Sequence, residues 1–283
     1  MRVARSRELV AQGRPAALVA RVAGISRQAI YRRPKRPPRA VRRPLDAVDR
    51  VVLGVANENP TDGTRMVAAL ASRAGGGPVN RKRVQRLMRE HRLLQPVRSE
   101  QRRRRPGSFQ VTRPDELWHL DMTSVWVAEH GWCYLNAAID CCTREITGWA
   151  LDVRCRATEA IAVVERAVAQ REVLPGSLTL GSDNGTAFTS RAFRARLAEH
   201  GITHRRGGYR DPESQAFIES WFSKLKLRCV WREEFESLDQ ARAVIGGYID
   251  GYHHRPHSGL AYRTPREVAA TWQDHRDDLT PAA

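Results

Sequence analysis

The sequence predicts an α/β fold in which a mixed five-stranded sheet with flanking helices follows small all-α units. From Leu117 onward, three apolar, β-rich runs follow one another at hairpin spacing and then give way to alternating helical and strand patterns. Before that point the chain is strongly basic, with short helical patterns separated by Pro- and Arg-rich stretches. The 283 residues suffice for one sizeable domain and one or two small ones.

Charge is distributed unevenly along the chain. The formal net charge is +17; residues 1–114 hold 28 Lys and Arg against 7 acids, whereas residues 115–283 hold 20 against 24. A charge of this size indicates a polyanionic partner rather than a particular fold. We therefore expect the first part to bind DNA. The mildly acidic second part would repel DNA unless some of its carboxylates hold metal cations.

Several other classes of protein are disfavoured. The five cysteines include no Cys-x-x-Cys pair, which argues against a disulfide framework or a zinc ribbon and predicts reduced core cysteines. No apolar run approaches the roughly 18 residues that span a membrane. The Arg-rich N-terminus lacks the apolar core of a secretory signal. These features predict a cytoplasmic, nucleoid-associated protein with no membrane partner.

Residues 1–34 are predicted to form a helix-turn-helix. The first helix is expected to run to about Ala23, Gly24 makes a turn, and Ser26 can cap a second helix. In the DNA-binding form of this motif the second helix reads bases, although an ordinary basic helical hairpin has the same pattern. The expected DNA contacts of this helix are Arg27, Gln28 and Arg32.

Residues 35–44 are predicted to be a linker, and residues 45–95 a second small helical domain in which Asn80 can cap a helix. A charged helix face is usually only solvated. Here nine Lys and Arg against five acids favour DNA. The expected contacts on this helix are Arg81, Lys82, Arg83 and Arg86.

Residues 96–113 are predicted to be a second basic linker, a flexible tether that adds to the contacts with DNA. Its expected contacts are Arg102, Arg103, Arg104 and Arg105.

The predicted sheet lies in residues 114–235, and residues 236–283 are expected to be a C-terminal helical extension. Strands are expected at 117–127, 132–139, 146–153, 178–180 and 202–206. Helices are expected at 157–170, at 189–200, from Asp211 and Pro212 onward, at 238–250 and at 264–273. The order β-β-β-α-β-α-β-α is typical of a ribonuclease-H-like fold.

Three acids lie where such a fold could bring them together. Asp121 is in the middle of an apolar strand, which is costly for a charge unless a cation compensates it. Asp183 ends the fourth strand, and Glu219 lies in the long helix with Lys226 seven residues later on the same face. Taken singly, each has an ordinary interpretation: Asp121 could be an outward-facing strand residue, Asp183 a turn-forming residue and Glu219 a surface residue. Phosphoryl transfer on DNA needs hard cations, which two or three carboxylates suffice to hold.

Together these positions resemble the integrase-type catalytic core of bacterial insertion-sequence transposases, in particular the insertion-sequence-three family. That family has an Asp after Trp in the first strand, Asp-Asn-Gly after the fourth, Glu-Ser on a helix, and a basic residue seven positions after the Glu. The counterparts here are Asp121, then Asp183, Asn184 and Gly185, then Glu219 and Ser220 after 35 intervening residues, and Lys226. Residues 63–65, 80–88 and 252–260 are also similar, so the resemblance covers nearly the full chain.

One departure from the family pattern precedes the Glu. The family commonly has Asp-Asn-Ala at this point, and this chain has Ser214, Gln215 and Ala216. The role of the Asn would therefore fall to Gln215 or be dropped.

The resemblance implies a bacterial DDE transposase whose Asp121, Asp183 and Glu219 hold two Mg²⁺ ions, with Mn²⁺ as a substitute. Such an enzyme cuts one DNA strand to leave a 3′-hydroxyl, which then attacks a second phosphodiester without a covalent protein–DNA intermediate. Lys226 and Asn184 would contact DNA. The implied partners are double-stranded DNA of the element ends and the target, further copies of this chain, and a product of an upstream reading frame, separate or fused.

Two other functions remain open on sequence grounds: a metal-dependent nuclease of the same fold that cuts without joining, and a catalytically inactive DNA-binding regulator. Asp140, ahead of Asp152, is the best alternative acid to Asp121, although Asp140 is expected to be chiefly a structural hydrogen-bonding residue.

Two further sets of residues have ordinary interpretations. A zinc site is disfavoured for His253, His254 and His257, which lack a nearby Cys and are expected to be structural or DNA-facing. The tryptophans expected in the core are Trp118, Trp126, Trp132 and Trp149.

Overall fold

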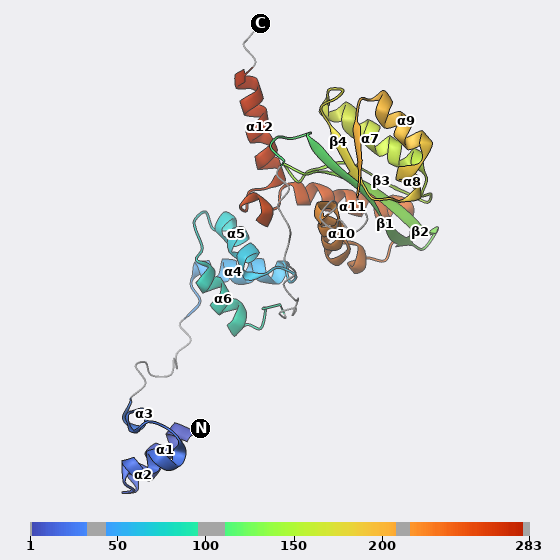
Figure 1. The fold of residues 1–283 in the computed structure, drawn as a ribbon. Helices are drawn as coiled ribbons and strands as arrows, with labels where there is room; N and C mark the ends of the chain where they lie inside the picture. Colours follow the sequence, from blue (N-terminus) through green and yellow to red (C-terminus); the bar gives the residue numbers. More distant parts are fainter. Residues whose placement is uncertain (1, 33–43, 96–110, 208–215, 280–283) are drawn as a thin grey trace. The chain divides into compact units, whose positions relative to one another are not determined.

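The computed structural model describes residues 2–32, 44–95, 111–207 and 216–279 (Figure 1). The chain divides into two compact units, Met1–Asp46 and Ala47–Ala283. Among the described helices, none combines the length and the apolar character needed to cross a bilayer. The arginines at 102–105 and the expected helix start at Asp211 lie outside the described residues.

The first unit contains three helices where the sequence predicted two. They are α1 (Arg2–Ala11), α2 (Ala16–Ala23) and α3 (Arg27–Tyr31). The expected first helix is broken because Gly13 takes a φ of +88° and Pro15 precedes α2. The capping prediction is confirmed: the Ser26 hydroxyl accepts a hydrogen bond from the backbone N–H of Ala29.

A three-helix group opens the second unit: α4 (Ala47–Glu58), α5 (Thr64–Ala74) and α6 (Arg81–Glu90). Its apolar core includes Val52, Val67 and Leu87. Asn80 caps α6 as predicted, since its side chain accepts a hydrogen bond from the N–H of Lys82.

The predicted five-stranded mixed sheet is confirmed. Its strands are β1 (Leu117–Val127), β2 (Gly131–Asp140), β3 (Ile146–Asp152), β4 (Thr179–Ser182) and β5 (Thr203–Arg206). The spatial order is β3-β2-β1-β4-β5, with antiparallel β1–β2 and β2–β3 pairs and parallel β1–β4 and β4–β5 pairs. β1 is therefore the central strand.

Helices cover both faces of the sheet (Figure 1). One apolar cluster joins the sheet to α7 (Ala157–Arg171), α8 (Thr186–Thr189) and α9 (Arg191–Glu199), and a second joins it to α10 (Ala216–Arg228) and α11 (Leu238–His253). The remaining elements are two short 3₁₀ turns, Val230–Arg232 and Ser258–Leu260, and α12 (Pro265–Leu279).

Alternation along β1 assigns its side chains to these two clusters. Trp118 and Leu120 belong to the α7 cluster, whereas Val125 and Val127 belong to the α10 cluster. Odd-numbered residues of β1 therefore face α10, and Asp121 is among them. Because helices cover both faces, Asp121 is not the outward-facing strand residue that the sequence also allowed.

Three core predictions are wrong. Trp126 and Trp132 are 55% and 58% exposed, and their rings form an edge-to-face pair with centroids 5.3 Å apart. They are cross-strand partners one position from the β1–β2 hairpin turn, where solvent reaches them. Cys155 is also exposed, because it lies in the loop that follows β3.

Candidate active site

The parallel pairing of β1 and β4 brings Asp121 and Asp183 to neighbouring positions. Leu120 pairs with Ser182 in this register. Asp121 and Asp183 each follow one residue later, so their backbones lie level on adjacent strands. Sequence spacing alone did not show this proximity.

Asp183 is oriented by the turn that follows β4. Its Oδ1 accepts a hydrogen bond of 2.8 Å from the N–H of Gly185. A Cβ atom at position 185 would lie only 2.9 Å from that same oxygen. The Asn184 side chain donates to the Gly207 carbonyl at 3.0 Å, which ties the turn to the end of β5. The Asp-Asn-Gly sequence is therefore required locally to hold the carboxylate of Asp183.

The carboxylate of Asp121 is half-buried and lies in a negative environment. Its Oδ1 accepts a hydrogen bond of 2.7 Å from the N–H of Met122. Burial, together with the negative charges of Asp183 and Glu219, raises the pKa of Asp121 to about 6, against the opposing effects of the Met122 N–H and of Lys226. Asp183, Glu219 and Lys226 are thus each within electrostatic reach of Asp121.

Glu219 and Lys226 come from α10, which packs against β1 and β2. Ile218, Trp221 and Leu225 form the buried side of this helix. Glu219 is exposed in its first turn, and Lys226 is half-buried in its last. Both charges act on Asp121, so α10 brings Glu219 and Lys226 toward it, which the helical spacing alone did not show.

The donor set suits a hard divalent cation, because every ligand it offers is a carboxylate oxygen. Among the described residues, the second oxygens of Asp121 and Asp183 accept no hydrogen bond, and a cation would relieve the repulsion between the acids. In the described ranges, however, no three His, Cys, Asp or Glu side chains lie close enough together to share one metal ion. Asp183 and Glu219 are therefore near enough to Asp121 to affect its pKa, but the three carboxylates are not close enough together to share one metal ion.

Asp140 is a structural acid, as expected. It is fully buried, and its two oxygens accept hydrogen bonds of 2.7 Å each from the N–H groups of Asp115, Cys142 and Thr143. These bonds fold the loop after β2 and leave the carboxylate without an open side. The less favoured alternative, Asp152, lies on edge strand β3 and accepts a 3.3 Å hydrogen bond from the N–H of Arg154.

Two of the three C-terminal histidines have structural partners. The His253 Nε2 accepts a hydrogen bond of 3.0 Å from the N–H of Ile146, and the His257 Nδ1 accepts one of 3.2 Å from the N–H of Gly259. Burial lowers the pKa of both imidazoles. His254 is exposed. These partners explain His253 and His257 without a metal.

Sequence reasoning missed His119, two residues before Asp121 on the same face of β1. Its ring is buried and stacks on Phe217 of α10 with centroids 5.8 Å apart. Burial lowers the pKa of His119 to about 4, and the charges of Arg144 and Arg205 act in the same direction. His119 therefore packs as a neutral ring against Phe217. Its two-residue spacing from Asp121 was the only available signal.

The residues predicted to contact DNA differ in their exposure and in whether they form ion pairs within the protein. Arg27, Gln28, Arg32, Arg81 and Lys82 are exposed. Arg83 is half-buried and pairs with the buried carboxylate of Asp49 at 2.7 Å. Arg86 is half-buried, with Glu90 at 3.9 Å. Arg83 is thus held within the three-helix group.

Three family models match successive parts of the chain. An HTH-like domain matches residues 45–105, and two integrase core domain models match residues 111–212 and 200–265. Together they include Asp121, Asp183 and Glu219. The chain belongs to the insertion-sequence-three (IS3) family of DDE transposases.

Curated relatives agree with this family. The chain is 30% identical over 161 residues to the transposase for insertion sequence element IS904 of Lactococcus lactis, an alignment that covers 56% of this chain and 63% of the relative. It is 29% identical over 259 residues to the insertion element IS476 uncharacterized 39.2 kDa protein of Xanthomonas euvesicatoria, covering 89% and 72%. Against transposase InsF for insertion sequence IS3A of Escherichia coli K12 it is 29% identical over 147 residues, covering 52% and 50%. The chain thus spans less than two thirds of the length of two of these relatives.

A solved structure shares the fold. The chain of a simian T-cell lymphotropic virus intasome in complex with a PP2A regulatory subunit is 15% identical, with a TM-score of 0.50, and the match covers 76% of this chain and 73% of that one. At this level of identity the likeness supports the ribonuclease-H-like architecture of this IS3-family chain.

Proposed function

We propose that this chain is a Mg²⁺-dependent transposase that cuts DNA at the ends of an insertion element and joins the new 3′-hydroxyls to a target. The observation that supports the proposal is that Asp121 and Asp183 lie level at one end of the β1–β4 pair, with Glu219 and Lys226 within electrostatic reach of Asp121. Family membership supports the reaction class.

Asp121, Asp183 and Glu219 would hold two divalent cations, which supply charge stabilisation at the attacking and leaving oxygens. Asp121 and Asp183 are pre-positioned by adjacent strands, and the Gly185 N–H fixes the direction of the Asp183 carboxylate. Lys226 would place its ammonium beside a DNA phosphate. In strand transfer the 3′-hydroxyl loses its proton as its oxygen bonds to phosphorus, and the displaced 3′-oxygen takes up a proton. Phosphodiester bonds are exchanged, and none is lost.

DNA would be bound by the basic helices as well as by the site. Arg27 and Gln28 on α3, Arg32 directly after it, and Arg81 and Lys82 on α6 are exposed and suited to phosphate or base contacts. We also propose that the domains have the boundaries predicted from the sequence and that several copies of the chain assemble on DNA. A product of an upstream reading frame is a further proposed partner.

The decisive experiment is to incubate the purified full chain with DNA that carries its flanking element ends, with Mg²⁺ or Mn²⁺, and to sequence the joined products. Glu219→Gln should abolish joining while DNA binding is kept. Glu233→Gln, which changes an exposed Glu outside the site, should join normally.

The alternatives give different products in the same reaction. Cut ends without joined products would show a nuclease, and DNA binding with neither product would show an inactive regulator. Normal joining by Glu219→Gln would remove Glu219 from the site.

A further inference from the structure

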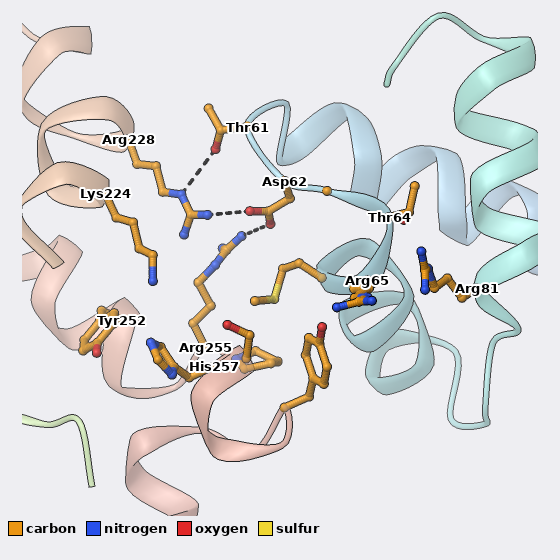
Figure 2. A pocket seen from close by; sticks show the side chains of 15 residues that line it. Thr61, Asp62, Thr64, Arg65, Arg81, Lys224, Arg228, Tyr252, Arg255 and His257 are labelled. Atoms are coloured by element: carbon orange, nitrogen blue, oxygen red, sulfur yellow. Dashed lines mark hydrogen bonds and ion pairs between the residues drawn. The ribbon is translucent and has the colours of Figure 1, made fainter. Parts of the chain in front are cut away.

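A cavity of about 390 Å³ lies beside α10 (Figure 2). By helical geometry it is on the opposite side of that helix from Glu219. It is lined by the α4–α5 loop and the start of α5, by Arg81 at the start of α6, by α10, and by the end of α11 with the segment that follows it. Lys224 and Arg228 enter it from α10, about 140° and 180° around the helix from Glu219. One helix therefore serves two separate features, the acidic site and this cavity.

The cavity is strongly cationic. Five basic side chains and a single carboxylate, that of Asp62, are among the residues that line it. The basic residues are Arg65, Arg81, Lys224, Arg228 and Arg255. Such a lining excludes a metal cation and disfavours an apolar ligand.

Asp62 balances only two of the five cations. It is buried at 2% exposure, and its two oxygens pair with Arg228 at 2.5 Å and with Arg255. Both ion pairs are drawn in Figure 2. A carboxylate held between two arginines is already satisfied. One negative charge cannot also neutralise the other three cations, although it acts on Lys224 at longer range.

Three cations are left over. Among the described residues, Lys224, Arg65 and Arg81 have no hydrogen-bond or ion-pair partner, and the Nε of Arg255 is buried without one. Lys224 approaches from one side of the cavity and Arg65 and Arg81 from the other (Figure 2). Desolvation and the charge of Arg228 lower the pKa of Lys224, and the negative charge of Asp62 only partly opposes them. An anion bound between these cations would raise the pKa of Lys224 again.

Neutral donors complete the lining. The Nδ1 of His257 accepts the N–H of Gly259, and burial with neighbouring positive charges lowers its pKa to about 4, so at neutral pH the proton is on Nε2. The side chains of Thr64, Ser258 and Tyr262 supply hydroxyl groups. Cations with several O–H and N–H donors make a set typical of phosphate recognition.

We propose that this cavity is a binding site for a phosphate group, with Lys224, Arg65 and Arg81 supplying the charge and His257 an N–H donor. The phosphate is either a backbone phosphodiester of bound DNA or a free phosphate ion. In its DNA form the proposal rests on the proposed function.

The first arm of the test measures the Tm of the full chain in sodium phosphate and in sodium chloride at matched ionic strength. For wild type we expect phosphate to raise Tm by about 3 °C or more at roughly ten times its dissociation constant. Lys224→Gln and the exposed Arg65→Gln should each lose at least half of this rise. Arg166→Gln, an exposed arginine of α7 on the other face of the sheet, is the matched control and should keep it.

The second arm measures binding of a duplex oligonucleotide between about 50 and 200 mM NaCl. Each phosphate contact contributes about 0.9 to the slope of log K against log salt, so Lys224→Gln should lower the slope by about 1 relative to Arg166→Gln. A change in the Tm arm alone identifies free phosphate, and a change in the slope alone identifies the DNA backbone. If neither arm separates Lys224→Gln and Arg65→Gln from Arg166→Gln, the phosphate site is refuted.

Strand transfer is read separately, so the two proposals can fail independently. A chain that shows the phosphate effect but joins no DNA keeps the cavity and loses the transposase proposal. A chain that joins DNA with neither effect does the reverse.

Discussion

The mid-strand site around Asp121 and the closed loop around Asp140 show opposite uses of an acid in the same sheet. Asp140 at the end of β2 accepts three backbone N–H groups, and Asp121 in β1 accepts one. Near Asp140, Arg171 pairs with both Asp115 and Glu145. Near Asp121, the neighbours are further acids and Lys226.

The difference distinguishes a structural carboxylate from one kept ready for a ligand. The fold itself supplies the partners of Asp140, so removing that acid should damage the fold. Around Asp121 the fold supplies repulsion and leaves an oxygen open, so removing that acid should damage chemistry and relieve strain. Each of the following predictions tests this distinction.

The largest expected effect is on strand transfer. Asp121→Asn keeps the size of the side chain but removes a metal-ligating charge, so we predict that joining falls about 10³-fold or more while DNA binding changes less than about threefold. Asp140→Asn should keep near-normal joining per folded molecule. Joined products are quantified by sequencing, with the folded fraction measured by circular dichroism. Equal losses of joining in the two variants would erase the distinction.

The next effect is on stability. The amide nitrogen of Asn cannot accept a hydrogen bond, so in Asp140→Asn at least one set of backbone N–H groups loses its partner. We predict that the free energy of unfolding falls by about 3 kcal/mol, measured by urea denaturation. Asp250→Asn, at an exposed acid of α11, is the control and should change it by less than about 0.5 kcal/mol. An unchanged midpoint for Asp140→Asn would show that its three bonds are dispensable.

Asp121→Asn should instead stabilise the chain at neutral pH. The pKa of Asp121 is about 6 in the folded chain, above its ordinary value of 3.8, so the folded state binds the proton more tightly. Stability from this group is therefore present below pH ~4 and is lost as pH rises through about 6. Because Asn cannot ionise, we predict a gain of about 1–3 kcal/mol at pH 7 without divalent ions and little gain at pH 4.

Magnesium provides the control for that measurement. A bound cation favours the ionised form of Asp121, so Mg²⁺ should stabilise wild type at pH 7 and not Asp121→Asn. Destabilisation of Asp121→Asn at pH 7 without metal would contradict the repulsion argument.

The contrast also shows what the sequence could and could not predict. Hydrophobic alternation predicted β1 with the observed bounds, and the spacing from Asp183 to Glu219 suggested the family. The local sequence could not show that Asp140 is structural and Asp121 is open, because this depends on their hydrogen-bond donors. One of the donors to Asp140 is the N–H of Asp115, 25 residues earlier in the chain.

Other features depended on long-range packing in the same way. Part of the cavity wall is held by ion pairs from Asp62 to Arg228 and Arg255, partners 166 and 193 residues away, and none of these residues carries a local signal. Trp126 and Trp132 are large aromatic residues of the kind usually found in a core. Their exposure depends on where the helices that cover the sheet end. Local chemistry therefore predicted elements and motifs, and tertiary contacts decided which polar groups remain open.

The smallest expected effect concerns the orientation of the Asp183 carboxylate. Asp183 owes its direction to a close approach of the Gly185 backbone, and a Cβ there would meet Oδ1 at 2.9 Å. In Gly185→Ala the carboxylate must swing aside, and we predict about tenfold slower joining with stability nearly unchanged, since misplacement of reacting groups is costly while the strand itself stays paired. Gly247→Ala, on an open surface of α11, is the matched control because, apart from its chain neighbours and the backbone of its own helix, nothing lies within 4 Å of its added Cβ. If Gly185→Ala joins DNA as fast as Gly247→Ala, the aim of Asp183 does not depend on this contact, and the motif glycine must be explained by the turn alone.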